Sequence, residues 1–178
     1  MLKTRKAAGF WDWQRIRWLY KRAFPKNERK PISAIKNLTK QGLGDVFVIE
    51  DGGFLGFATT MEAGDRVLLD YFAIKKSCRG KGFGGLALNR IKELFKDKRL
   101  VVEIERADIP SSDQKMRKAR KRFYLNQGLV CTGITVVLFG VRMELLAANG
   151  TVTFEEYKDI YLTCAGSKIA KNVVLDEG

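Results

Sequence analysis

The sequence predicts an α/β fold in which helices are interleaved with the strands of one mixed sheet. Segments with apolar residues at helical spacing alternate along the chain with short, strongly apolar segments typical of strands. No internal repeat, low-complexity segment or linker interrupts this pattern, and 178 residues suit a single hydrophobic core. We therefore expect one domain over residues 1–178.

The first half of the chain predicts two helices followed by three strands. A helix of about four turns is expected to end at Pro25. Its apolar positions are Trp13, Ile16, Tyr20, Ala23 and Phe24. A short second helix begins near Pro31, a residue type favoured in the first helical turn. Strands are expected over residues 46–49 and 54–60, on either side of an Asp-Gly-Gly hairpin turn, and a longer apolar strand over 67–74 is expected at the centre of the sheet.

The second half predicts three more helices and three more strands. In chain order they are a helix over 84–95, a strand over 100–105, a helix over 111–127, strands over 132–139 and 141–148, and a helix over about 153–165. Ser111 with Gln114, and Thr153 with Glu156, have capping-box spacing at the starts of two of these helices. The last two strands form a closing hairpin around Gly140.

Composition and charge narrow the possible chemistry. The chain has no histidine, which excludes a serine–histidine triad and any zinc site with imidazole ligands, and we expect no metal. Its formal net charge of +13 attracts polyanions such as nucleic acid, acidic membranes or a phosphate-rich cofactor. The three cysteines form no CxxC pair, and no apolar run reaches the roughly 20 residues that cross a bilayer. We therefore expect a cytoplasmic protein without a membrane partner.

The glycine-rich segment from Arg79 to Gly85 joins the central strand to the following helix. Glycines at such a junction let the backbone approach a phosphate, and the helix N-terminus offers free N–H groups. Gly80-x-Gly82-x-x-Gly85 also matches the fingerprint of nicotinamide dinucleotide-binding oxidoreductases, with an acidic residue about 20 positions further on. However, five residues separate the strand from the first glycine, and few parallel strand–helix units remain downstream. An oxidoreductase is therefore the less favoured alternative.

The same segment can also be read as Arg79-x-x-Gly82-x-Gly84, following the same strand and its connecting residues. Further along, residues 119–129 read Ala-Arg-Lys-Arg-Phe-Tyr-Leu-Asn-Gln-Gly-Leu, a helix that ends in Phe-Tyr before a Gly-apolar pair. Together these motifs resemble the GNAT superfamily of acetyl-CoA-dependent N-acetyltransferases. The resemblance implies a central, mostly antiparallel sheet of six to seven strands with helices on both faces. Residues 1–6 are short and basic where the family has a first strand, so the sequence supports a strand there only weakly.

The resemblance implies that acetyl-CoA is the cofactor and that residues about 66–96 form its binding segment. The loop backbone would cradle the pyrophosphate. The loop residues are Arg79, Gly80, Lys81, Gly82, Phe83, Gly84 and Gly85. The strand end at Phe72, Ala73 and Ile74 would pair with the pantetheine arm, and the Ile74 amide would polarise the thioester carbonyl. Arg117 is a candidate contact for the 3′-phosphate of CoA.

Tyr124, in the second motif, is the candidate general acid, since a phenol can protonate the thiolate that leaves when an amine attacks the thioester. Without the family context, an amphipathic tyrosine at the margin of the core is the alternative. The amine also needs a base. The first candidates are Asp70, a lone acid in the apolar central strand, and Glu28, in the loop between the first two helices. Glu103 and Glu105 are further candidates, and a structural ion pair is the alternative for each acid.

The acceptor is expected to be a small-molecule or peptide amine, and the acids in an otherwise basic chain favour a cationic one. Residues 115–122 hold six cations without an acid. Solvation explains such a run, but a nucleic-acid-binding module without catalysis is a competing function. The last helix could pack on the core, shape the acceptor pocket or mediate a homodimer.

Overall fold

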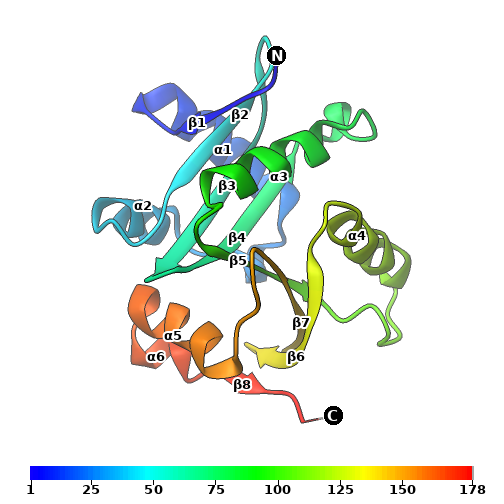
Figure 1. Cartoon of the computed structure of the whole chain (residues 1–178). Coiled ribbons are helices and arrows are strands. Elements are labelled where there is room, and N and C mark those ends of the chain that lie inside the picture. The colour runs from blue at the N-terminus through cyan, green and yellow to red at the C-terminus, as the bar shows by residue number, and fades with distance from the viewer. Residues whose placement is uncertain (178) are drawn as a thin grey trace. The chain divides into compact units, whose positions relative to one another are not determined.

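The computed structural model describes residues 1–177, which divide into two compact units (Figure 1). The first unit comprises Met1–Met61 with Leu69–Leu94, and the second comprises Glu62–Leu68 with the chain from Phe95 onward. Strand β4 (Arg66–Ile74) belongs to both, because its first three residues are in the second unit and the rest are in the first. Segments distant in sequence therefore build each unit.

The first unit contains the glycine-rich segment and the elements on either side of it. These elements are β1 (Lys3–Lys6), α1 (Gly9–Ala23), α2 (Ile32–Lys40), β2 (Val46–Glu50), most of β3 (Phe54–Ala63), the end of β4 and α3 (Phe83–Leu94), with short 3₁₀ helices at Lys26–Glu28 and Lys76–Cys78. The two helices and three strands predicted for the first half of the chain are all present, with somewhat different ends.

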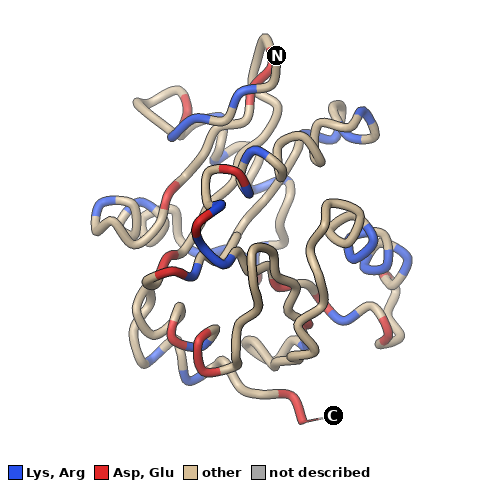
Figure 2. The backbone as a smooth tube through the Cα atoms, in the orientation of Figure 1, with Lys and Arg blue, Asp and Glu red and all other residues tan. Residues whose placement is uncertain are grey.

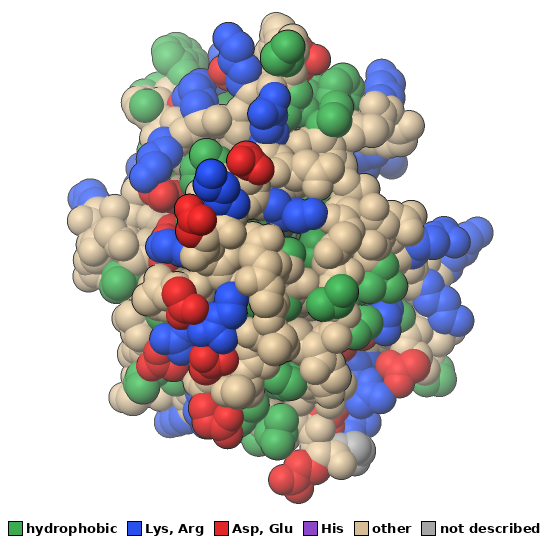
Figure 3. All heavy atoms as spheres, in the orientation of Figure 1, with side chains coloured by type: hydrophobic (Ala, Val, Ile, Leu, Met, Phe, Trp, Pro, Cys, Tyr) green, Lys and Arg blue, Asp and Glu red, His purple; other side chains and the backbone are tan. Residues whose placement is uncertain are grey.

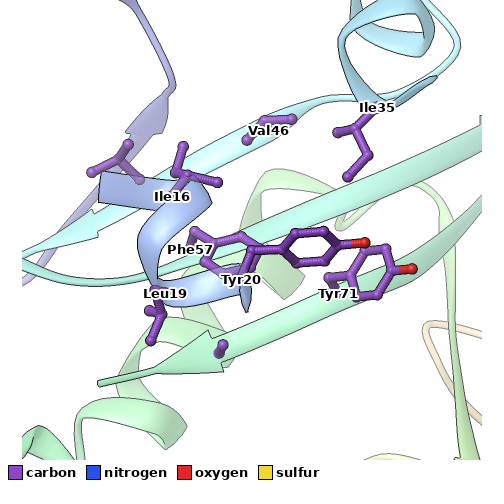
Figure 4. Close-up of a cluster of buried hydrophobic side chains, with 9 residues drawn as sticks. Ile16, Leu19, Tyr20, Ile35, Val46, Phe57 and Tyr71 are labelled. Atoms are coloured by element: carbon purple, nitrogen blue, oxygen red, sulfur yellow. The ribbon is translucent and has the colours of Figure 1, made fainter. Parts of the chain in front are cut away.

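Helices α1 and α2 cover one face of the strands in this unit (Figure 4). The buried side chains on this face are Ile16, Leu19 and Tyr20 of α1, Ile35 of α2, and Val46, Val48, Phe57, Tyr71 and Ala73 of the strands. The rings of Tyr20 and Tyr71 meet edge to face, with their centroids 4.8 Å apart. Aromatic pairs of this geometry add to the stabilisation from apolar burial, so this contact helps to hold α1 on β4.

Helix α3 covers the opposite face, because alternate strand residues point to opposite sides of a sheet. Ile74 at the end of β4 packs there in one buried cluster with Leu55 of β3 and Ala87 of α3. Phe83, in the first turn of α3, packs against the same cluster. The glycine-rich segment therefore runs between a buried strand end and a well-packed helix start.

Residues 3–6 form the edge strand β1, although the sequence supported a strand there only weakly. The strand pairs with β2 in antiparallel orientation. Its Arg5 forms ion pairs with Glu50 of β2 and with the buried Asp12 of α1. A basic segment can form this strand because acids on the neighbouring elements offset its charge.

The second unit contains the start of β4 and the chain after α3. Its other elements are β5 (Arg99–Glu105), α4 (Gln114–Asn126), β6 (Val130–Leu138), β7 (Val141–Ala148), α5 (Phe154–Ala165), α6 (Ser167–Ala170) and β8 (Val173–Leu175). The short α6 and β8 were not predicted, because each has too few residues to show a periodic pattern. Glu103 of β5 contacts α5 and Glu105 contacts α4, so both helices lie on the same face of β5.

The two predicted capping boxes have different outcomes. At α5 the box is confirmed: the Glu156 amide donates to the Thr153 hydroxyl at 3.2 Å, and the Thr153 amide donates to the Glu156 carboxylate at 2.9 Å. At α4 the prediction is wrong, because the helix begins at Gln114, after Asp113. The Ser111 hydroxyl donates to the Asp113 carboxylate at 2.7 Å, and the Asp113 side chain does not cap the helix.

The strands follow the hydrogen-bonded order β1-β2-β3-β4-β5-β7-β6-β8. The β4–β5 pairing is parallel and joins Arg66–Leu68 to Arg99–Val101. The β1–β2, β2–β3, β5–β7, β6–β7 and β6–β8 pairings are antiparallel. The predicted mixed, mostly antiparallel sheet is thus confirmed, with eight strands in the described chain instead of six or seven.

Helix α4 carries a dense group of basic residues (Figure 2), which project at the right-hand edge of the face shown in Figure 3. Three of its cations are matched by acids of the same unit: Arg117 and Arg120 pair with Glu105, and Lys121 pairs with Glu144. Over residues 1–177, no helix combines the length and the apolar character that a bilayer span requires.

Strand β3 approaches β4 closely at Gly56. A Cβ at this position would lie 2.2 Å from the carbonyl oxygen of Ala73 and 2.9 Å from Cδ1 of Ile74. A backbone carbonyl cannot turn aside as a flexible side chain can. Only glycine therefore fits here without displacing β4.

We predict that Gly56→Ala lowers the free energy of unfolding by about 1–3 kcal/mol, because the added methyl group overpacks the sheet. The control is Gly53→Ala, where an added Cβ meets nothing within 4 Å and the backbone φ is not positive. We expect the control to be unchanged or slightly more stable, since alanine restricts the unfolded chain. Urea denaturation measures both variants, and equal stabilities would contradict a tight contact at Gly56.

Candidate cofactor-binding site

The glycine-rich segment lies between the end of β4 and the first turn of α3. Its backbone has positive φ at Gly80 (74°) and Gly82 (80°), a conformation that glycine adopts without strain. The residues from Arg79 to Gly82 are exposed. A Cβ built on either glycine would meet no atom within 4 Å, so both positions open onto free space. In the protein alone, the positive φ favours glycine at both positions, whereas no neighbouring atom excludes a larger side chain.

Helix α3 begins at Phe83, directly after this loop. The Leu86 amide donates to the Gly82 carbonyl at 3.1 Å, which starts the helical hydrogen-bond ladder. Amides in the first turn have no carbonyl of a preceding turn to bind, and no acid lies in that turn. The positive end of the helix therefore faces a loop that also carries Arg79 and Lys81. This arrangement suits a phosphate group.

Arg79 ties the loop to the strand that precedes it. Its Nε donates to the Ile74 carbonyl at 3.0 Å, across the intervening 3₁₀ helix. Ala73 and Ile74 are buried and Phe72 is partly buried, so the strand end is well supported. The pairing of β4 with β5 ends at Leu68, four residues before Phe72.

Asp70 of β4 forms an ion pair with Lys30, in the loop between α1 and α2. Lys30 Nζ lies 2.7 Å from Asp70 Oδ1 and 3.0 Å from Sδ of Met61. The Asp70 side chain is only 5% exposed. The ion pair and the burial leave little room for this carboxylate to contact an incoming amine.

Tyr71 holds the same loop with two hydrogen bonds. Its hydroxyl donates to the Glu28 carbonyl at 2.8 Å and accepts from the Lys30 amide at 3.1 Å. The Tyr20 hydroxyl donates to the Lys30 carbonyl at 3.2 Å. Burial, together with the nearby charge of Asp70, raises the pKa of Tyr71, so its hydroxyl keeps the proton that it donates. The Glu28 side chain is exposed, and the backbone of its loop is held by the hydroxyls of Tyr71 and Tyr20.

The remaining candidates, Tyr124 and Arg117, lie on α4 in the second unit. Tyr124 is 8% exposed, and burial raises the pKa of its hydroxyl to about 12. That hydroxyl has no hydrogen-bond partner among the described residues. Arg117 is paired on two sides, with Glu105 at 2.9 Å and Asp113 at 2.8 Å. Two acids of its own unit therefore already match the Arg117 charge.

The profile of the Acetyltransferase (GNAT) family matches residues 13–124, which is more than half of the chain. The chain belongs to the GNAT acetyltransferase family. The matched segment runs from α1 to α4 and contains both the glycine loop and Tyr124. The resemblance inferred from two motifs is confirmed, and the protein is an acyltransferase. A search of curated proteins gives no match.

Solved structures of GNAT proteins share the fold at low sequence identity. A protein described as a GNAT-family acetyltransferase from Bacteroides thetaiotaomicron has a TM-score of 0.78 and 18% identity, covering 94% of this chain and 98% of that one. A spermidine N-acetyltransferase from Vibrio cholerae, solved with CoA and spermine, has a TM-score of 0.63 and 14% identity, over 83% and 94% of the two chains. The ribosomal-protein-S18-alanine N-acetyltransferase from Escherichia coli has a TM-score of 0.61 and 16% identity, over 86% and 96%.

Two polar clusters in this GNAT protein were not predicted. The first is the Lys30–Tyr71 arrangement described above, whose partners are far apart in sequence. In the second, the Glu103 carboxylate accepts hydrogen bonds from Tyr161, at 2.9 and 3.0 Å, and from Tyr157. The two tyrosines are four residues apart, so both hydroxyls lie on one helix face. This spacing is the pattern in the sequence that could have indicated the cluster.

We predict that Tyr124 makes stability fall between about pH 10 and pH 12. In the unfolded chain its hydroxyl ionises near 10, whereas in the folded protein the pKa is about 12. The contribution is fully present below pH 10 and is lost as the pH rises towards 12, because only the unfolded state then releases the proton. Between pH 10 and pH 12, the free energy of unfolding of Tyr124→Phe should therefore fall by about 2–3 kcal/mol less than that of the wild type. Denaturant titrations at several pH values test this, and parallel curves for the two proteins would contradict it.

Proposed function

We propose that this GNAT protein transfers the acetyl group of acetyl-CoA to a primary amine, by direct attack of the amine in a ternary complex. The observation that carries the proposal is the glycine loop. Two exposed glycines at positive φ lead into a helix N-terminus that has no acid in its first turn. Such a loop offers backbone N–H groups and positive potential to a pyrophosphate. Membership of the family supports the same cofactor.

The residues of the loop fit this cofactor. The open space beside Gly80 and Gly82 allows a diphosphate to approach the backbone, and a Cβ would occupy that space. We assign the binding of the diphosphate to the amides of the loop and of the first turn of α3. Lys81 is exposed and supplies a cation beside them. Arg79 has the different role of holding the loop against the Ile74 carbonyl.

When bound, acetyl-CoA supplies a thioester as the acyl donor. We propose that the backbone of Phe72, Ala73 and Ile74 binds the pantetheine arm as a neighbouring strand would. The end of the β4–β5 pairing at Leu68 supports this assignment. The Ile74 amide then donates to the carbonyl oxygen on which negative charge develops in the transition state.

We propose Glu28 as the base in preference to Asp70. An amine is mostly protonated at neutral pH and must lose a proton before it attacks. The Glu28 side chain is exposed and its backbone carbonyl is held by Tyr71, so the carboxylate is presented from a fixed loop. Asp70 positions this loop through its ion pair with Lys30 and does not touch the amine.

Tyr124 stabilises the departing thiolate, in our proposal, by donating a hydrogen bond to the sulfur. A thiol of ordinary pKa about 8.5 is a much stronger acid than a phenol of pKa about 12. Complete transfer of the phenol proton is therefore uphill by roughly 5 kcal/mol. A hydroxyl without a partner in the described chain is instead available to donate. We propose no role for Arg117 at the cofactor, since two carboxylates already bind it.

The acceptor that we propose is a cationic amine. The exposed Glu28 in a chain of net charge +13 offers a negative group where a positive one would bind. Among proteins of the same fold, one is named for spermidine and another for the alanine of a ribosomal protein, so both a polyamine and a peptide amine belong to the class. Three free cysteines suit the reducing conditions of the cytoplasm, where we place this activity.

The test is calorimetric titration with acetyl-CoA. We predict that Gly82→Ala lowers the affinity about tenfold or more, because the methyl group enters the phosphate cradle and strains the loop, with loss of one or two charge-assisted hydrogen bonds. Gly42→Ala is the matched control. Gly42 also has positive φ (69°) and an open Cβ position, so it shares the backbone strain without lying in the loop.

The wild-type protein and the Gly42→Ala variant should bind acetyl-CoA equally well. Equal binding by Gly82→Ala would remove the loop from the site. If the wild type itself has no affinity for acetyl-CoA, the proposed function is wrong.

We also predict that Tyr124→Phe lowers kcat by about 10- to 100-fold with little change in KM for acetyl-CoA, because only the transition state contains the sulfur anion. Tyr161→Phe, which removes a hydroxyl bound to Glu103, serves as the control and should mainly affect stability. Steady-state kinetics with a polyamine acceptor measure both variants. An unchanged kcat in Tyr124→Phe would exclude this tyrosine from the reaction.

A further inference from the structure

The outer face of α1 leaves three large aromatic side chains in solvent. Phe10 is 65% exposed, Trp11 is 72% exposed and Trp18 is 46% exposed. The inward face of the same helix already fills the core with Ile16 and Tyr20, so packing does not require the exposed rings. Several exposed aromatic groups on one helix mark an interaction surface.

Basic residues share this face with the aromatic ones. Trp11, Arg15, Trp18 and Arg22 follow at i, i+4, i+7 and i+11, which places them in one stripe about 60° wide. The Arg22 guanidinium already stacks on the Trp18 ring, 4.3 Å from its centroid. The acid of α1 is Asp12, which is buried and bound by Arg5. The exposed face of the helix therefore has positive charge without a compensating carboxylate of its own.

A groove of about 560 Å³ continues this surface next to Trp18. Arg22 lines it together with Lys75, Lys76 and Arg79, which precede or begin the glycine loop. In the described chain no acidic residue lines this groove. An aromatic wall with four cations around a hollow suits a ligand that has both flat rings and phosphates.

We propose that α1 and this groove bind a single-stranded nucleic acid. Bases stack on Trp11 and Trp18, while the arginines of the stripe and the lysines of the groove contact phosphates. The basic run on α4 is a poorer site, because acids of its own unit match three of its cations. This binding is separate from acetyl transfer and involves no covalent step.

A membrane surface fits the same residues less well. Helices that lie in a bilayer interface separate an apolar face, which enters the lipid, from a cationic face, which does not. Here Arg15 lies between Trp11 and Trp18 on one stripe, so burial of both rings in lipid would carry a guanidinium with them. A nucleic acid offers bases to the aromatic rings and phosphates to the arginines of the stripe.

The test is fluorescence anisotropy with labelled single strands of RNA and of DNA, about 12 nucleotides long. Acetyl-CoA is present at saturation, so that the glycine loop is filled in every arm. We predict that Trp11→Ala/Trp18→Ala weakens binding about tenfold or more, since stacking is lost. Arg15→Gln/Arg22→Gln should reduce the slope of log K against log salt by about 1.4. Quenching of tryptophan emission in the wild type should accompany binding.

The matched control is Lys115→Gln/Lys118→Gln, which also removes two positive charges, but from α4 instead of α1. We expect its affinity to change by less than about threefold, and thermal unfolding confirms that each variant is folded. The proposal is overturned if neither strand binds at low salt, or if the α4 variant loses binding while the tryptophan variant keeps it. Binding to vesicles of anionic lipid, without binding to either strand, would also overturn it and assign the face to a membrane.

Discussion

The ion pair between Lys30 and Asp70 is the interaction on which the first unit depends most. It joins the loop between α1 and α2 to the strand that leads into the glycine loop. Tyr71, the next residue of that strand, binds the same loop through its hydroxyl. Removal of the Lys30 charge would leave the Asp70 carboxylate buried without this partner, which is more costly than loss of an exposed pair. The position of the loop that presents Glu28 is therefore set by β4.

This coupling changes the meaning of the acid in the central strand. From the sequence, Asp70 was a candidate base because it interrupts an apolar run. In the structure its carboxylate is already engaged, and Glu28 presents an exposed carboxylate on the loop that Asp70 holds. Our proposal therefore gives Asp70 a positioning role and Glu28 the role of the base.

The features that could be predicted are those with local physical causes. The glycine loop depends on backbone conformation within a few residues, and the cap of α5 depends on residues three apart, so both are visible in the sequence. The partners of Asp70 and Glu103 could not be predicted, because they lie 40 and 58 residues away and meet only through the tertiary fold. β1 was weakly predicted for a related reason: the acids that offset its charge belong to other elements.

Charge has two different roles in this chain. On α4, three basic residues form ion pairs with acids of β5 and β7. The number of basic residues in the sequence therefore overstates the positive charge that a partner could contact. On α1 fewer cations are present, but they stand beside exposed rings and face outward. Accessible charge is therefore a property of the pairing within the fold and not of the composition.

The hydrogen bonds from Tyr157 and Tyr161 to Glu103 make a strand inside the family match depend on a helix outside it. The family match ends at residue 124, yet a carboxylate of β5 depends on a helix that begins thirty residues later. Arg99, at the start of β5, likewise binds Glu156 of that helix. A substitution at Glu103 or Arg99 would therefore also change the contacts of the C-terminal helix.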